Sequence, residues 1–172
     1  MSLKRWLLLA LGVAVGTHLM TLFATPYVMM GGVHLIARLN DGHGHLQIFP
    51  KVQAGKDVVV RSSPDLLYSA CPFDLSKGNY EIQAPPTDSY TSVSMFAYNT
   101  DNFFAQNDLD SPDGIHLVLA KPERQVTVPE GATLVKSETP YGLILFRYYV
   151  ADKQVVELDA IRAKATCRLL ST

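Results

Sequence analysis

The segment YNTDNFFAQNDLDSPDG, residues 98–114, concentrates polar side chains that could bind a cation or transfer a proton. It holds four aspartates and three asparagines. An EF-hand loop needs D-x-[DN]-x-[DN]-G and a glutamate at the twelfth position. Counted from Asp108, the fifth position is Pro112 and the twelfth is Leu119, so the pattern fails. Because Asp, Asn, Pro and Gly also favour turns, we interpret the segment first as a turn and second as a ligand site.

Other carboxylates suggest acid–base chemistry. Asp65, Asp74 and Asp101 are the candidates for a catalytic pair in a hydrolase, with or without a divalent metal. Their spacing does not show that they converge, and all three also suit turns or strand ends. No G-x-S-x-G, P-loop or G-x-G-x-x-G motif occurs, so the chain lacks the usual signatures of α/β-hydrolases and nucleotide-binding proteins.

The histidines of DGHGH (41–45) suggest a metal. His43 and His45 could share an ion, but a catalytic zinc normally needs three protein ligands plus water. His34 and His116 are the other histidines of the domain, and no HExxH motif is present. A solvated glycine-rich connector accounts for the segment equally well. We therefore predict no metal and no cofactor.

Aromatic residues suggest a binding surface. A patch around Tyr98 and the two neighbouring phenylalanines would favour a protein-binding function if it is exposed. An apolar cavity inside the domain would instead favour a small-ligand carrier. Tyrosines in β-rich domains also commonly belong to the core or its rim. The binding candidates are Tyr68, Tyr90, Tyr98, Asn102, Phe103 and Phe104.

The N-terminus predicts a membrane anchor. Residues 6–30 contain no acidic residue, lysine or arginine, and about twenty apolar residues suffice to cross a bilayer. Lys4 and Arg5 precede this run, which favours a cytoplasmic N-terminus. A cleaved signal peptide is the alternative, but its apolar region is shorter, about 7–15 residues, and no good cleavage site follows here. Either way we expect the rest of the chain to be exported to the periplasm, and we favour an uncleaved anchor that holds it to the bacterial inner membrane by a single span.

The composition indicates one exported globular domain. Hydrophobic residues make up 48% of the chain and charged residues 18%, while 15 basic and 16 acidic residues are interspersed. The chain therefore lacks the basic patch that nucleic-acid binding needs. Cys71 and Cys167 are an even count without CxxC spacing, which in an oxidising compartment favours one disulfide over two buried thiols.

Turn signals every eight to twelve residues separate short β-favouring runs, a pattern typical of an antiparallel sandwich or barrel. A change to helical spacing after residue 152, with Asp152 as a possible cap, predicts a C-terminal helix. We divide the chain into a cytoplasmic end and transmembrane anchor (1–30), a connector (31–50), whose first turns could extend the helix, and a β domain (51–172). The expected strands are 57–61, 80–84, 91–98, 115–120, 125–128, 132–137 and 142–150.

Several blocks between residues 33 and 168 resemble the bacterial domain-of-unknown-function family numbered 1254, in particular its short membrane-anchored members. The blocks are SPDLLYSACPFDLS (63–76), NYEIQAP (79–85), the strand with Tyr90, Ser92 and Ser94, TDNFFAQND (100–108), and a terminal helix ending at Cys167. The resemblance implies a sandwich-like β domain, in agreement with the strand pattern.

The resemblance also implies a partner. Longer relatives join this domain to a second β-rich domain of a family numbered 1214, which the short members would meet as a separate chain. The family supplies no catalytic residues to transfer, and Ala97 stands where longer relatives often have an aspartate. We therefore expect an anchored accessory subunit that binds another envelope protein. An Asp-based hydrolase is the alternative, and a small-ligand carrier the third possibility.

Overall fold

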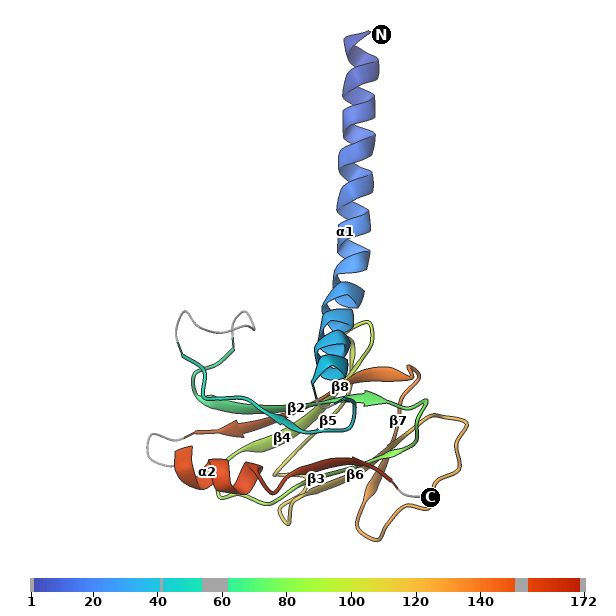
Figure 1. Cartoon of the computed structure of the whole chain (residues 1–172). Helices are drawn as coiled ribbons and strands as arrows, with labels where there is room; N and C mark the ends of the chain where they lie inside the picture. The colour runs from blue at the N-terminus through green and yellow to red at the C-terminus, as the bar shows by residue number, and fades with distance from the viewer. Residues whose placement is uncertain (1, 41, 54–61, 151–154, 171–172) are drawn as a thin grey trace.

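The computed structural model describes residues 2–40, 42–53, 62–150 and 155–170, and consists of one long helix standing on two stacked β-sheets (Figure 1). The elements are α1 (Leu3–Leu39), β1 (Gln47–Ile48), β2 (Leu66–Asp74), β3 (Tyr80–Ala84), β4 (Thr91–Ala97), β5 (Asn102–Asn107), β6 (Ile115–Ala120), β7 (Thr133–Lys136), β8 (Tyr141–Tyr149), α2 (Val155–Arg162) and β9 (Thr166–Leu169).

Helix α1 has the length and apolarity to cross a membrane, and its apolar window is not buried by the rest of the chain. Its hydroxyl groups are satisfied internally: Thr17 donates to the carbonyl of Val13, and Thr25 to that of Thr21. Such bonds let polar residues sit in an apolar helix without leaving a free donor. The helix continues to Leu39, so the first turns of the predicted connector are helical.

The predicted sandwich is confirmed. The helix-side sheet has the order β1-β2-β8-β4-β5 and lies under α1, and the distal sheet has the order β7-β6-β3-β9 and lies on the far side (Figure 1). All pairings are antiparallel except that of β6 with β7. Alternate residues of each sheet point inward, as the period of a β-strand requires. The largest fully buried side chains between the sheets include Leu67, Phe73, Tyr80, Ile82, Leu117, Leu119, Ile144, Phe146 and Tyr148.

A disulfide joins the two sheets. Cys71 of β2 and Cys167 of β9 are bonded, with their Cα atoms 6.4 Å apart, as predicted. The bond closes a sequence separation of 96 residues, so it links the middle of the domain to its end.

Three strands of the helix-side sheet were not predicted, the first being the short β1 within the predicted connector 31–50. The run LLYSACPFD forms β2 although it contains Pro72, which cannot donate to a ladder and therefore argues against a strand. The run NFFAQN forms β5 although Asn is depleted in strands. Pairing decides the conformation of β2 and β5: β2 pairs along its whole length with the apolar β8, and β5 pairs with the buried β4.

Two expectations near the end of the domain were wrong. Residues 125–128 do not form a strand, although QVTV alternates in polarity. Residues 166–169 form β9 rather than the end of the C-terminal helix, because they pair with β3 and carry the bonded Cys167. The helix itself is present as α2. The predicted strand 57–61 and the cap Asp152 lie outside the described residues.

Candidate functional site

The C-terminal turns of α1 rest against the ends of the strands of the helix-side sheet. His34 faces Tyr98, which follows β4, and Tyr141, which begins β8, with ring centroids 5.6 and 5.7 Å away. Tyr27, two turns earlier on the helix, lies 6.1 Å from Tyr98. These aromatic contacts fix the base of the helix on the domain. We call this region the helix foot and define it by His34, His43, Asp74, Tyr98 and Tyr141.

Two buried histidines form the centre of the helix foot. Nδ1 of His34 and Nε2 of His43 are 2.7 Å apart, and the residues are only 5% and 7% exposed. One nitrogen must donate and the other accept, so the two imidazoles cannot both be charged. Burial lowers the pKa of His43, and the nearby negative charge of Asp74 opposes that shift only in part. The pair is therefore neutral at neutral pH.

The second nitrogen of His34 has no such partner. Nε2 of His34 is buried, and although the backbone of Gly142 lies near the ring, it makes no hydrogen bond of acceptable geometry within the described residues. A buried polar atom without a partner costs free energy, and it commonly marks a place where a water or ligand binds.

Asp74 closes the lower side of the helix foot. Burial alone would raise the pKa of Asp74, but hydrogen bonds from the hydroxyl and amide of Ser76, together with positive charge that His43 carries in acid and that Lys77 carries throughout, lower it. Oδ1 of the carboxylate is thus held by the turn after β2, which is the strand-end role that the sequence suggested.

A cavity of about 480 Å³ opens beside the helix foot. Four helix residues and two tyrosines line it: Gly31, His34, Leu35, Arg38, Tyr98 and Tyr141. None of these residues is acidic. The cavity lies outside the sandwich, whose interior is filled by side chains, and so differs from the internal cavity expected of a small-ligand carrier.

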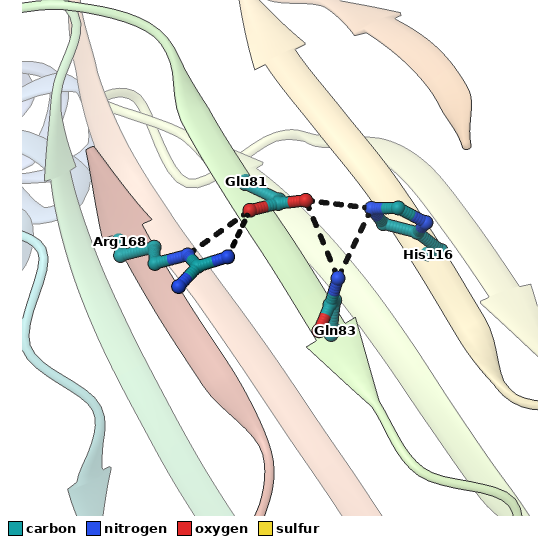
Figure 2. A network of polar contacts seen from close by, with 4 residues as sticks. All are labelled: Glu81, Gln83, His116 and Arg168. Atoms are coloured by element: carbon teal, nitrogen blue, oxygen red, sulfur yellow. Dashed lines mark hydrogen bonds and ion pairs between the residues drawn. The ribbon is translucent and has the colours of Figure 1, made fainter. Parts of the chain in front are cut away.

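A second polar cluster lies on the outer face of the distal sheet (Figure 2). We call it the outer-face array and define it by Glu81, Gln83, His116 and Arg168. The register of β3 places Glu81 opposite Arg168 of β9 and Gln83 opposite His116 of β6. Both nitrogens that Arg168 uses bond Oε2 of Glu81, at 2.8 and 3.0 Å.

The other oxygen of Glu81 is also occupied. Nε2 of His116 lies 2.9 Å from Oε1, and the amide of Gln83 lies 3.3 Å from the same atom. Nε2 of His116 cannot both donate to Glu81 and accept from Gln83, so both groups donate to the carboxylate. Arg168 and His116 together lower the pKa of Glu81. The side chain of Glu81 is only 12% exposed, and it is covered by Arg168, which is 66% exposed, and by His116, which is 24% exposed.

Of the three candidate catalytic aspartates, Asp65 lies far from Asp74, whereas Asp74 and the turn that holds Asp101 belong to the same edge of the helix-side sheet. Asp65 precedes β2 and Asp74 ends it, so a nine-residue strand of about 30 Å separates them. Asp101 accepts a hydrogen bond from the side chain of Asn99, and its own amide donates back to Asn99, which closes the turn after β4. The segment 98–114 is thus a turn, the edge strand β5 and a second turn.

The two candidate metal ligands, His43 and His45, lie in different surroundings. His45 is exposed, whereas His43 is engaged with His34. Within the described part of the chain, no group of three or more His, Cys, Asp or Glu side chains is placed to hold a metal ion.

The binding candidates fall into three places. Tyr68 accepts a hydrogen bond from the amide of Ser63, and Tyr90 is exposed at 42%. Tyr98 is half-buried at the helix foot. The remaining candidates form the start of β5, where Asn102 is exposed while Phe103 and Phe104 pack against the core. The exposed aromatic patch that would have favoured protein binding is therefore absent from the described surface.

Sequence analysis missed Glu81, Gln83, Arg168, Arg38 and Tyr141. The alternation of YEIQA does place Glu81 and Gln83 on one face, which could have been noticed. Their partners come from strands 35 and 87 residues away, and no local pattern reveals that register.

Comparison with known proteins places the fold. The family model described as "Protein of unknown function (DUF1254)" matches residues 44–168. The crystal structure of the VPA0106 protein from Vibrio parahaemolyticus is similar, with a TM-score of 0.65 and 15% identity over 87% of this chain and 35% of that chain. A putative uncharacterized protein from Burkholderia cenocepacia gives a TM-score of 0.52 and 14% identity, over 86% of this chain and 40% of that chain. No curated protein matches the chain.

Proposed function

The chain belongs to the DUF1254 family of proteins of unknown function, and from this premise we propose that it is a membrane-anchored accessory subunit whose β domain binds a second envelope protein. Helix α1 supports the anchor. The disulfide between the two sheets is consistent with an oxidising compartment such as the periplasm. The resemblance to short members of the family suggests a 1214-type chain as the partner.

The greater length of the similar solved structures supports the proposal that this chain has a partner protein. This chain spans only 35% and 40% of the two similar structures, so in those proteins the same fold is accompanied by a larger amount of other chain. A domain that folds next to a neighbour in one protein commonly keeps a surface suited to such a neighbour. We propose that a separate polypeptide occupies that surface here.

The open edge strand β5 is the observation that carries the proposal. In the part of the chain that the structure describes, β5 pairs only with β4, so one side of its backbone is free to bond another strand. Proteins normally protect such edges with charged residues or proline, and NFFAQN contains neither. Its one protective feature is a bulge at Phe103, which leaves residues 104–107 in regular register.

Strand addition to β5 would give main-chain hydrogen bonds to a partner and leave the sandwich unchanged. The opposite edge of the same sheet is less suitable because β1 has only two residues. The hydrolase alternative has less support. Asp65 and Asp74 lie at opposite ends of β2, and Asp101 is hydrogen-bonded within the turn after β4.

Site-specific photocrosslinking in intact membranes tests this proposal. A photoreactive amino acid replaces Ala105, which is exposed on β5, and in a control it replaces Glu130, which is exposed in the connection before β7. We expect one discrete crosslinked species from position 105 and none from position 130. Ala105→Lys, which places a charge on the edge strand, should lower co-purification of that same species severalfold. Equal crosslinking from both positions, or co-purification that Ala105→Lys does not change, would contradict the proposal.

A further inference from the structure

We infer that the cavity at the helix foot binds the phosphate of a phospholipid headgroup. The inference rests on one part of the proposed function, namely that α1 crosses the membrane, and it is independent of the partner at β5. Three features support phosphate binding: the depth of the cavity in the bilayer, the groups that line the cavity, and the apolar surface beside it.

Two aromatic residues of α1 indicate how deeply the helix, and with it the cavity, lies in the bilayer. Trp6 and Tyr27 are exposed and lie 21 residues apart, a helical rise of about 31 Å. The hydrocarbon core of a bilayer is about 30 Å thick, and Trp and Tyr concentrate at its two surfaces. Tyr27 therefore marks the surface on the side of the β domain.

The cavity begins one turn beyond that surface. Gly31 lies about 6 Å along the helix from Tyr27, and the headgroup layer extends about 5–7 Å beyond the hydrocarbon. Tyr98 reaches the same level, since its ring contacts Tyr27 and its hydroxyl lies against Gly31, where a Cβ atom would approach it to 3.3 Å. Glycine thus allows this hydroxyl to lie against the helix at headgroup depth.

The lining carries the donors that a phosphate requires. Arg38 is exposed and has no ion-pair partner within the described residues. Arg38 lies about 16 Å along the helix beyond Tyr27, and because side chains of a helix tilt toward its N-terminus, its guanidinium is directed back toward the headgroup layer. Arginine presents several donors in a plane that matches phosphate oxygens. The hydroxyls of Tyr98 and Tyr141 add two further donors on the opposite wall.

The lining itself contains no carboxylate. Asp74, whose Oδ1 accepts from Ser76, stays negatively charged behind the histidine pair, and Asp101 accepts from Asn99; neither belongs to the lining. The histidine pair is neutral and holds the wall in place, with His34 between the two tyrosines. The net charge of the lining is therefore positive, from Arg38 alone.

The surface beside the cavity favours a lipid over free phosphate. Leu35 lines the cavity and is 58% exposed, and the helix continues from Gly31 into the exposed apolar run that predicts the membrane span. An acyl chain attached to a phosphate in the cavity would lie along this run in the hydrocarbon layer. A free phosphate would gain nothing from it.

Native mass spectrometry of the full chain in a non-ionic detergent tests the inference. The probes are phosphatidylethanolamine, a diacylglycerol that lacks the phosphate, and inorganic phosphate as a competitor. We expect one phosphatidylethanolamine per chain, much less diacylglycerol, and no displacement by millimolar phosphate. Arg38→Gln should lower the bound fraction about tenfold, as loss of a hydrogen bond to a charged group does. Tyr141→Phe should lower it less, and Lys164→Gln, which removes an exposed charge from the turn after α2, should not.

Three outcomes would overturn the inference. Equal retention of phosphatidylethanolamine and diacylglycerol would mean that the phosphate is not recognised. Displacement by inorganic phosphate would make the cavity a free-phosphate site. Unchanged binding in Arg38→Gln, or equal loss in Lys164→Gln, would exclude a specific role of Arg38. The disulfide-dependent mobility of each variant on a non-reducing gel verifies that the domain has folded.

Alkaline carbonate extraction of the same membranes tests the anchor separately. Release of the chain would overturn the anchored function and with it the depth argument. Retention of the chain together with lipid binding that does not depend on Arg38 would overturn the cavity site alone and leave the photocrosslinking test of β5 unaffected.

Discussion

The helix foot and the outer-face array use the same residue types in opposite ways. In the helix foot, His34 and His43 are buried and bond each other, and the nearby carboxylate of Asp74 is held by Ser76. In the outer-face array, the carboxylate of Glu81 is buried beneath His116 and Arg168, which bond it directly. The first region excludes charge from its centre, and the second is organised around one.

The difference teaches that the partners of a buried group, and not its burial alone, decide whether the group is charged. Burial removes hydration from the charged form of the imidazole, so the pKa of His43 is lowered. Glu81 is also buried, but hydrogen bonds from Arg168 and His116 outweigh its loss of hydration and lower the pKa of the carboxyl. The two regions should therefore respond to acid at different pH values.

The largest expected effect comes from separating the two regions. The double variant Cys71→Ala, Cys167→Ala removes the bond between β2, which ends at the helix foot, and β9, which carries Arg168. In the chain-entropy model a loop of this length stabilises the fold by about 4–5 kcal/mol. We expect a loss of that order in the free energy of unfolding, measured by urea titration of the full chain in detergent.

Reduction of the unmodified protein provides the control for the double variant. Once unfolded in a reducing buffer, it should refold to the same lowered stability. A midpoint equal to that of the oxidised protein would show that packing alone holds the sheets together.

An intermediate effect is expected from acid at the helix foot. Because the pKa of His43 in the folded state is below 6.5, the unfolded chain binds more protons as the pH falls through 6.5. The stabilising effect of the neutral histidine is complete above 6.5 and decreases below it. We expect the melting temperature to fall between about pH 7.5 and about pH 5.5. His43→Gln should reduce this dependence, whereas His45→Gln, at an exposed position, should preserve it. An unchanged slope in His43→Gln would show that His43 does not govern this range.

The smallest effect is expected at the outer-face array. Arg168 is 66% exposed, and exposed ion pairs contribute roughly 0–1 kcal/mol, so Arg168→Gln should destabilise the fold by less than about 1 kcal/mol. The lowered pKa of Glu81 gives stability that is complete above 4.5 and is lost as the pH falls through the lower folded pKa. Arg168→Gln should therefore weaken the acid dependence below about pH 4.5 and leave that near pH 6.5 unchanged. A loss of several kcal/mol would show that the array is more deeply buried in solution than in this structure.

Local sequence patterns were sufficient to predict those helices and strands whose own residues decide their conformation. The apolar run 6–30 lies within α1, and the alternating runs 80–84 and 115–120 are β3 and β6. The two cysteines were paired correctly because only one pairing exists. The candidate site was different: Asp65, Asp74 and Asp101 were singled out by type, and the structure puts Asp65 and Asp74 at opposite ends of β2 and Asp101 in the turn after β4.

Taken alone, the sequence determined a long apolar helix, a chain cut by turns into short strands, and one possible disulfide, because periodicity, turn chemistry and composition are local properties. Only the tertiary structure decided that residues 166–169 pair with β3, that Arg168 meets Glu81 across 87 residues, and that His34 stacks on His43 beneath two tyrosines. Strand register and the closure of long loops depend on how whole sheets pack. Residues throughout the core contribute to that packing, so no local stretch of sequence reveals it.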